Sequence, residues 1–425
     1  MASYPYWLPF ARANRMFERP CRSLTLAVGA LTAMLLPVGA SAADVYSWSP
    51  NVAAAQPPED HQQGETALAT DAKGRIWLAF IDAQYHRVAT GNWIDWPRAV
   101  RLFVSSDGGR TFDAQPDLGE PAGDQALAAD RKGRVFASYV QYSDSSAGRL
   151  QQQIVVRRLD KEQPANTSCL PWDDKTRHDQ SSIHIGAGGD LYVIGADIGG
   201  PDARGLLFAR SLDDGRTCLH AQRLAGLGEL PQVVEAAQAT LIVGPGGYYT
   251  SKDHGVTFSV RRTRRFGQKL VRVDVSPDRK RVYVVGDSVS GGLVLSISED
   301  GGNTWSVTHI GAADQVRAWR YPAVQVNEDG RVHIVWIDDR GGSAALYHVY
   351  SDDGGARFST ATKISDAPFI FPADAPPPPP ATQDGTWIGD YLSLTTFGKT
   401  VVVAWSDQRA GTPKSVVRTS VGTPR

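Results

Sequence analysis

The sequence predicts an all-β protein that forms a single β-propeller of four-stranded antiparallel blades. Short segments of alternating polarity are separated by turn residues at intervals of roughly eight to twelve positions, which is typical of antiparallel sheets. The pattern is clearest in residues 321–358, where three alternating segments are separated by turns containing Gly330 and Gly342. One such sheet cannot bury both of its faces, so we expect the unit to repeat along the chain.

A turn motif with the pattern Ser/Thr-x-Asp-x-Gly-x-Thr-aromatic supports this repetition. The aspartate can accept a hydrogen bond from the backbone two residues on, and the glycine tolerates the positive φ of a tight hairpin. Later copies follow one another at roughly 40 to 53 residues, which fits one propeller blade per copy. The motif begins at Ser105, Ser211, Ser251, Ser298 and Ser351.

A second pattern, a turn followed by an apolar strand, counts the blades more completely. It recurs seven times, beginning at Asp71, Asp130, Gly188, Ala239, Asp278, Asp329 and Phe397. We therefore favour seven blades. The second and seventh units lack the first turn motif, so six blades with one degenerate unit are the alternative.

Residues 1–42 have the features of a signal peptide. Leu24 to Leu36 form an apolar stretch, and Ala40-Ser41-Ala42 fits a cleavage site before Ala43. The stretch is too short to span a membrane, which takes about 20 residues. The region before it is ordinary in length if translation starts at Met16, which would make 1–15 a misassigned start. We expect an extracytoplasmic protein, either periplasmic or secreted.

The rest of the chain is predicted to be one domain. Residues 43–62 would lead into the propeller and add an outer strand to the last blade, and residues 63–425 would form the blades. The formal net charge is −1, and the predicted leader removes more basic than acidic residues. This balance excludes neither glycans nor proteins as partners, but it disfavours nucleic acid and anionic membranes. We expect a monomer without a membrane span, cofactor or metal site.

Two cysteines remain after the predicted cleavage. Cys169 and Cys218 are about one blade apart, and Cys218 replaces the aromatic residue of its turn motif. An oxidising compartment would allow them to form a disulfide. The alternative is two buried, unpaired side chains, because sequence spacing does not show that the geometry permits a bond.

The turn motif is the Asp box, and its repetition resembles that of the sialidase-like β-propellers. The resemblance covers nearly the whole chain after the leader and implies the propeller fold. It says less about activity, because the Asp box builds a turn and performs no chemistry. Folds of this kind host many functions.

Aligning the repeats with one another places polar residues at one end of the predicted channel. A ring rich in carboxylates, with arginines and tyrosines from the last two units, predicts a binding mouth for a glycan, another small acidic ligand or a protein. For any single aspartate the alternative is a salt bridge or a local turn. The residues of this predicted mouth include Glu65, Asp124, Asp179, Arg320, Tyr321, Asp338, Arg340, Asp390, Tyr391, Asp407 and Arg409.

The resemblance implies catalytic roles for three residues. Tyr391 would be the nucleophile, Glu229 its base and Asp95 the acid/base, as sialidases use a tyrosine where most glycosidases use a carboxylate. The three arginines that hold a sialic acid carboxylate in that family have no counterparts at the expected positions. Arg320, Arg340 and Arg409 would have to replace them. Two hypotheses follow: a sialidase-type exo-glycosidase, or a non-catalytic propeller that binds a ligand or assembles with a protein.

Overall fold

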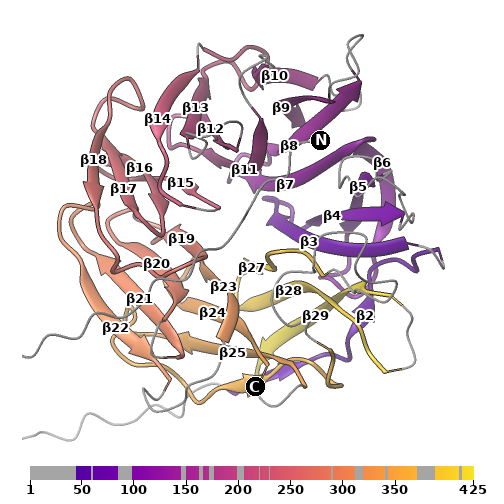
Figure 1. Ribbon diagram of the computed structural model, residues 1–425. Helices are drawn as coiled ribbons and strands as arrows, with labels where there is room; N and C mark the ends of the chain where they lie inside the picture. The colour runs from indigo at the N-terminus through magenta and orange to yellow at the C-terminus, as the bar shows by residue number, and fades with distance from the viewer. Residues whose placement is uncertain are drawn as a thin grey trace, which may run out of the picture. The chain divides into compact units, whose positions relative to one another are not determined.

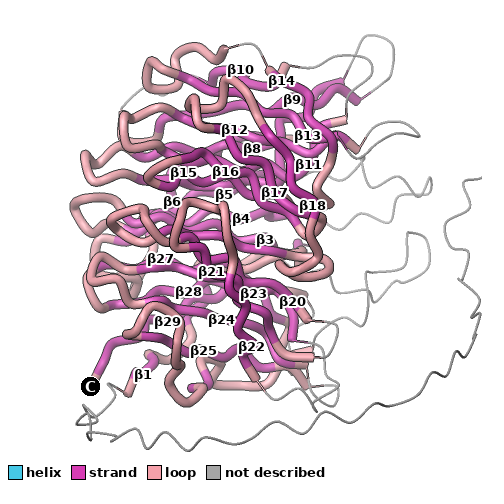
Figure 2. Tube along the Cα trace, turned by 90° about the vertical axis from the view of Figure 1, so that its left-hand side faces the viewer, coloured by secondary structure: helices cyan, strands magenta, loops and turns pink. Residues whose placement is uncertain are grey.

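The computed structural model describes most of the chain beyond the predicted leader. The described residues are 45–58, 61–84, 98–144, 150–161, 166–171, 177–198, 205–219, 221–228, 230–288, 291–311, 319–339, 343–370, 388–410 and 414–425. They contain strands, turns and loops but no helix, so none of them belongs to a helix long and apolar enough to cross a membrane (Figure 2).

Within the described residues the strands form seven antiparallel sheets (Figure 1). Blade 1 contains β3 (His61–Thr70), β4 (Ile76–Gln84), β5 (Arg98–Ser105) and β6 (Asp113–Gly119). Blade 2 contains β7 (Ala122–Ala129), β8 (Val135–Asp144), β9 (Leu150–Arg158) and β10 (Asn166–Leu170). Blade 3 contains β11 (His178–Ile185), β12 (Leu191–Asp197), β13 (Gly205–Ser211) and β14 (Gln222–Ala225). Blade 4 contains β15 (Gln232–Ala236), β16 (Ala239–Gly244), β17 (Gly247–Ser251) and β18 (Ser259–Arg262).

The remaining blades follow the same order. Blade 5 contains β19 (Val271–Val275), β20 (Val282–Asp287), β21 (Leu293–Ser298) and β22 (Ser306–Ile310). Blade 6 contains β23 (Trp319–Val326), β24 (Val332–Asp338), β25 (Ala345–Ser351) and β26 (Thr362–Lys363). Blade 7 combines β27 (Ser393–Phe397), β28 (Thr400–Asp407) and β29 (Val416–Pro424) with β1 (Tyr46–Trp48), and β2 (Val52–Ala53) also pairs with β29.

The seven blades close into a ring. Each inner strand contacts the inner strands of both neighbouring blades, in the order β3, β7, β11, β15, β19, β23, β27 and back to β3. The inner strands therefore surround a central axis (Figure 1). This confirms the all-β propeller of four-stranded antiparallel blades predicted from the repeats, with seven blades rather than six.

The ring is closed by strands from both ends of the domain. β1 pairs with β29, with Tyr46 opposite Pro424 and Trp48 opposite Gly422. The Tyr46 hydroxyl also donates a hydrogen bond to the Lys399 carbonyl oxygen at 2.9 Å. The segment that leads into the propeller thus supplies the outer strand of blade 7, as the sequence predicted.

The five turns with the Asp motif share one hydrogen-bond pattern. In the first, the Ser105 hydroxyl donates to Asp107 at 2.8 Å and accepts the Gly109 N–H, while Asp107 accepts the N–H and hydroxyl of Thr111 at 3.0 and 2.7 Å. In the third blade the corresponding bonds from Thr217 lower the pKa of Asp213 to about 2.

Because each turn joins the third strand of a blade to its outer strand, all five lie on one face of the ring, which we call the turn face. The inner strands begin on the opposite face, which we call the mouth face.

Cys169 and Cys218 form a disulfide, which settles the question that the sequence left open. Cys169 lies on β10, the outer strand of blade 2, and Cys218 lies in the Asp turn of blade 3. Both cysteines pack in an apolar cluster that also contains Ile154 and Leu207. The bond therefore ties two neighbouring blades together at their outer edges.

Candidate functional site

The inner strands of four blades carry the same irregularity near their starts. In β3, β7, β11 and β23 the pairing with the second strand shifts, so that two residues lie opposite one. One residue of each bulge has a positive φ: Glu65 (55°), Asp124 (53°), Gln180 (53°) and Tyr321 (52°). Bulges re-aim side chains, and left-handed non-glycine residues are strained and concentrate at functional sites. The repeated strain indicates a site on the mouth face.

Electrostatic coupling shows that carboxylates from several blades meet at this end of the axis. We call the residues Glu65, Asp124, Asp179 and Asp390, together with the groups around them, the mouth cluster. Burial, reinforced by the negative charges of Asp124 and Asp390, raises the pKa of Glu65 well above its usual range. Blades 1, 2, 3 and 7 contribute these four groups, and such coupling requires them to lie close together. Asp390 is exposed, so the cluster opens to solvent.

Two acceptor atoms of the mouth cluster are buried without a donor. Glu65 Oε2 and Gln125 Oε1 have no hydrogen-bond partner among the described residues, and both side chains are buried. Gln125 uses its amide nitrogen to donate to the backbone carbonyl oxygen of Glu65, which fixes the Gln125 side chain relative to the strained residue of blade 1. An unsatisfied buried acceptor costs about 1–3 kcal/mol. Both atoms are therefore available to a donor from a ligand.

Asp124 and Asp179 form a pair between blades 2 and 3. Burial and the adjacent Asp124, through its charge and a hydrogen bond, raise the pKa of Asp179 well above its usual range. The Tyr142 hydroxyl donates to Asp124 Oδ2 at 3.3 Å. Burial thus favours the protonated form of Asp179, beside an Asp124 that accepts a hydrogen bond from Tyr142. Adjacent carboxyl groups of this kind can exchange a proton with a ligand.

Arg98, Arg272 and Tyr391 complete the mouth cluster. The Arg98 guanidinium lies over the Tyr142 ring, 4.1 Å from its centroid, and Arg272 lies over the Tyr391 ring at 5.1 Å. Burial lowers the pKa of Arg272 to about 10. Burial and the charge of Glu65 raise the pKa of Tyr391 well above its usual range. Tyr391 therefore stays protonated at neutral pH.

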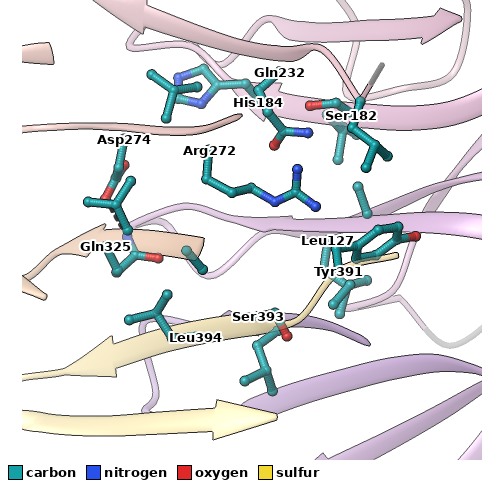
Figure 3. Close-up of a pocket in the computed structure, with 18 of the residues that line it drawn as sticks. Leu127, Ser182, His184, Gln232, Arg272, Asp274, Gln325, Tyr391, Ser393 and Leu394 are labelled. Carbon is teal, nitrogen blue, oxygen red and sulfur yellow. Dashed lines mark hydrogen bonds between the residues drawn. The ribbon is translucent and has the colours of Figure 1, made fainter. Parts of the chain in front are cut away.

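Below the cluster the axis contains a cavity of about 210 Å³ (Figure 3). Arg272 and Tyr391 border it at the mouth, and His184 and Asp274 lie deeper. Burial lowers the pKa of His184 to about 4 and raises the pKa of Asp274 to about 7. Asp274 Oδ2 accepts hydrogen bonds from the Gln325 side chain at 2.7 Å and from the Val326 N–H at 2.6 Å. The channel is therefore lined by polar groups along its length.

The structure brings together part of the mouth predicted from sequence. Glu65, Asp124, Tyr321, Asp390 and Tyr391 belong to the electrostatically coupled group. By strand register, Tyr391 is the seventh blade's equivalent of Glu65. Glu229, Asp95 and Arg340 lie outside the described residues, so the roles predicted for them stay predictions.

Other predicted residues contact charged groups of the protein, and one of them, Arg320, also acts on Tyr321 through its charge. Arg320 Nε contacts Asp339 at 3.0 Å, and Asp338 is buried at the end of β24. Asp407 is buried between Arg409 and Arg418, at 3.0 and 2.7 Å.

Arg409 also joins the two ends of the domain. It donates to Asp366 at 2.5 Å and to the Asn51 side chain at 2.7 Å. Asn51 precedes β2, so this guanidinium ties the N-terminal segment to blade 7. Its position supports ring closure rather than ligand binding.

Sequence analysis did not single out Arg98, Gln125, Tyr142 and Arg272 as members of the site. Arg98 begins β5 and Tyr142 lies near the end of β8, so both reach the cluster from second or third strands. Neither residue stands next to a turn motif, so the sequence repeats give no sign that its side chain reaches the mouth. Among the described residues, no group of three or more histidine, cysteine or acidic side chains is arranged to hold a metal ion.

Comparison with known proteins supports the fold. No protein-family profile matches the sequence, and no curated protein matches it. A solved structure of a protein of unknown function from Dyadobacter fermentans DSM 18053 is similar over 89% of this chain and 99% of that chain, with 14% identity and a TM-score of 0.54. At this identity the similarity shows the fold alone.

Two other solved structures are less similar. The Hadza microbial sialidase Hz136 has 14% identity and a TM-score of 0.44, covering 85% of this chain and 66% of that chain. A GH43_1 enzyme from Xanthomonas citri has 11% identity and a TM-score of 0.39, covering 72% and 93%. These similarities are too low to bear on the function.

Proposed function

We propose that this protein is an exported propeller that binds a glycan at the mouth cluster. The observation that carries the proposal is the pair of buried acceptors, Glu65 Oε2 and Gln125 Oε1, which lack a donor among the described residues. Sugar hydroxyls are donors that can satisfy both atoms at once. The partly buried ring of Tyr321 packs beside the buried Tyr391 in the same group and adds an apolar surface with a polar end, as sugar-binding sites require.

The charge of the mouth cluster favours a neutral sugar over an acidic one. Four carboxyl groups face two guanidinium groups, Arg98 and Arg272, in the coupled set. Binding of a sialic acid carboxylate would require Arg320, Arg340 and Arg409 to replace the three arginines that hold it in the sialidase family. Arg320 and Arg409 instead contact carboxylates of the protein. A carboxylate ligand would therefore bring a further acidic group to a cluster whose two arginines already face four carboxyl groups.

Binding can be tested with a panel of neutral and acidic oligosaccharides, followed by calorimetry on the sugars that bind. Glu65→Gln keeps the size of the side chain but replaces one acceptor with a donor. We expect it to weaken binding of the best neutral sugar about tenfold, the effect of losing about 1.4 kcal/mol.

Glu299→Gln is the matched control, because Glu299 is an exposed residue paired with Arg281 in an Asp turn on the opposite face. It should bind as the unchanged protein does. Equal binding by the Glu65→Gln variant, or the absence of any sugar ligand, would count against the proposal.

Glycoside hydrolysis is a second candidate function, favoured by the Asp124–Asp179 pair. A carboxyl group that keeps its proton beside a carboxylate can act as a general acid. The raised pKa of Tyr391 argues against the tyrosine nucleophile that the family resemblance implies, because that role needs the phenolate. A hydrolase of this kind would therefore rely on the carboxyl groups.

The two hydrolytic schemes give different results in one assay of product release. If Asp179 is the acid, Asp179→Asn should lower kcat at least about a hundredfold with little change in KM, and Tyr391→Phe should keep most of the activity. Loss of activity in Tyr391→Phe would instead support the sialidase-type mechanism. No release from any sugar that binds would leave the non-catalytic function.

Export is proposed from the N-terminal sequence and is supported by the disulfide. A disulfide between Cys169 and Cys218 is the expected state in an oxidising compartment and uncommon in the cytosol. Sequencing the N-terminus of the mature protein from the periplasm or medium should give Ala43 as the first residue. A cytosolic protein that retains residues 16–42 would contradict the proposal.

A further inference from the structure

A large cavity lies away from the mouth cluster, between blades 4 and 5. Its volume is about 1170 Å³, against about 210 Å³ for the cavity on the axis. It is bordered at the mouth face by the end of β18 and the loop that leads to β19, and along the blade by the outer strand β22 with Trp305 before it. We call it the arginine groove, defined by Arg262, Arg264, Arg265, Trp305 and His309.

The loop that carries the arginines is anchored at its centre. Phe266 is fully buried, and its ring contacts that of Trp305 edge-on, with centroids 4.7 Å apart. The Ser296 hydroxyl donates to the Arg265 carbonyl oxygen at 3.1 Å. Gly286 lets the loop approach so closely that a β-carbon there would overlap the Phe266 carbonyl oxygen. Arg264 and Arg265 are thus presented by a fixed backbone, which reduces the entropy lost on binding.

Within the described part of the chain, no carboxylate pairs with the arginines of the groove. Arg262, Arg264 and Arg265 are exposed and form no ion pair among the described residues. The acid that borders the groove, Asp287, accepts hydrogen bonds from three successive backbone N–H groups, those of residues 268–270, at 3.0–3.3 Å. A chain with a net charge of −1 therefore brings three exposed guanidinium groups to one concave surface, where Arg262 donates to the Gly226 carbonyl oxygen at 2.5 Å and none has a carboxylate partner among the described residues.

We propose that the arginine groove binds an acidic polysaccharide, through carboxylate or sulfate groups on successive sugar units. Arginine recognises such groups with two parallel hydrogen bonds. Trp305 and Val307 add an apolar strip against which a sugar face can pack. A lipid surface would need a flat or protruding patch rather than a groove. Single-stranded nucleic acid would need several aromatic platforms, and the groove borders on one tryptophan.

The proposal concerns a site separate from the mouth cluster and does not depend on the function proposed there. It is tested by calorimetry on the full chain with polygalacturonate oligosaccharides as the acidic probe and dextran fragments of equal length as the neutral one. We expect binding of the acidic probe only, weakening as NaCl is raised. Arg264→Ser combined with Arg265→Ser should reduce the affinity about tenfold.

The matched control removes two positive charges from the turn face, with Arg131→Ser and Lys132→Ser, both in an exposed turn. It should keep the affinity, and both variants should keep the thermal midpoint of the unchanged protein. Three outcomes would overturn the proposal: no binding of polygalacturonate, equal loss in the two double variants, or equally tight binding of single-stranded DNA or anionic vesicles that is lost in the groove variant.

Discussion

At the scale of single residues, Asp274 is the clearest example of a side chain whose chemistry is set by its position. It lies on the inner strand β19, facing the cavity on the axis, and burial raises its pKa to about 7. In the unfolded chain its pKa is near 3.9. Between these values the folded protein binds more protons than the unfolded chain. The stability contribution of Asp274 is therefore greatest at low pH and falls as the pH rises toward 7.

Replacing this residue should remove that dependence. Asp274→Asn keeps an oxygen that can accept hydrogen bonds from Gln325 and Val326 but cannot ionise. We expect the variant to be more stable than the unchanged protein at pH 8, by at most about 4 kcal/mol, and close to it at pH 4. Urea unfolding at both pH values measures the difference. An equal loss of stability at both pH values would show that the carboxylate is not the cause.

The sequence marks Asp274 only as a polar residue within an alternating segment. Alternation shows which side chains share a face of a strand, but it does not show that this face lines a closed channel. The same limit explains why Arg272 was not predicted to join Tyr391. Residue-level chemistry at the axis depends on the arrangement of all seven blades.

At the scale of structural elements, the Asp turns do more than reverse the chain. The glycine at the fifth position of each turn packs against the preceding blade. A β-carbon on Gly255 would lie 2.5 Å from Phe208 of blade 3, and one on Gly302 would lie 2.8 Å from Leu241 of blade 4. The glycine is therefore needed both for a positive φ and for the contact between blades.

Two alanine substitutions separate these effects. Gly255 (φ 83°) contacts the neighbouring blade, whereas a β-carbon on Gly108 (φ 77°) would have nothing within 4 Å. We expect Gly108→Ala to cost about 1–2 kcal/mol for the backbone alone, and Gly255→Ala to cost a further 1–3 kcal/mol or so for overpacking. The free energy of unfolding in urea measures both. Equal costs would show that the packing against blade 3 is unimportant.

The turns were predictable because their signal is local. The hydrogen bonds of each turn join residues within five positions, so the motif carries its own structure. The bulges at Glu65, Asp124, Gln180 and Tyr321 have no such signal. A bulge is a shift in the pairing between two strands, so it becomes visible only when the neighbouring strand is in place. The positions of the acidic residues were therefore predicted, but the strained backbone that aims them was not.

At the scale of the whole molecule, the disulfide stabilises the contact between two blades. Cys169 and Cys218 are separated by 49 residues in the sequence. Closing a loop of that length in the unfolded chain contributes about 4 kcal/mol in the chain-entropy estimate. Cys169→Ser with Cys218→Ser should lower the free energy of unfolding by about 2–4 kcal/mol under non-reducing conditions. A reductant should lower the stability of the unchanged protein but not of the variant.

The repeats were sufficient to predict the ring, its seven blades and the strand that closes it. Repetition makes each blade bury its faces against its neighbours, so the global arrangement follows from the local unit. The site was predicted in part, because residues at equivalent positions of a ring meet at the axis. Asp407 and Arg409 stand at the end of the second strand of blade 7, as the equivalent predicted residues of other blades stand at the end of theirs. Arg409, however, donates a hydrogen bond to Asn51 of the closing segment, which the other blades lack. Closure breaks the symmetry on which the alignment relied.

Closure also covers a histidine pair of blade 6, which should make the ring sensitive to acid. His333 Nδ1 and His348 Nε2 are 3.0 Å apart, and Tyr46 of the closing strand packs edge-on against both rings. Arg331 also faces the pair, lying over the rings of Tyr46 and Tyr350. Burial and then the charge of Arg331 lower the pKa of His333 to about 3. Protonation would place a positive charge beneath β1, next to an arginine.

The sign of the effect follows from proton binding. Unfolded histidine has a pKa near 6.5, so between about pH 6.5 and 3 the unfolded chain binds the proton that folded His333 does not. Stability should then fall by about 1.4 kcal/mol per pH unit as the pH decreases through this range, which gives about 2 kcal/mol between pH 6.5 and 5. His333→Gln cannot take up this proton and should show a shallower decrease. Urea midpoints measured at pH 7 and pH 5 for both proteins test this prediction, and parallel decreases would assign the acid sensitivity to other groups.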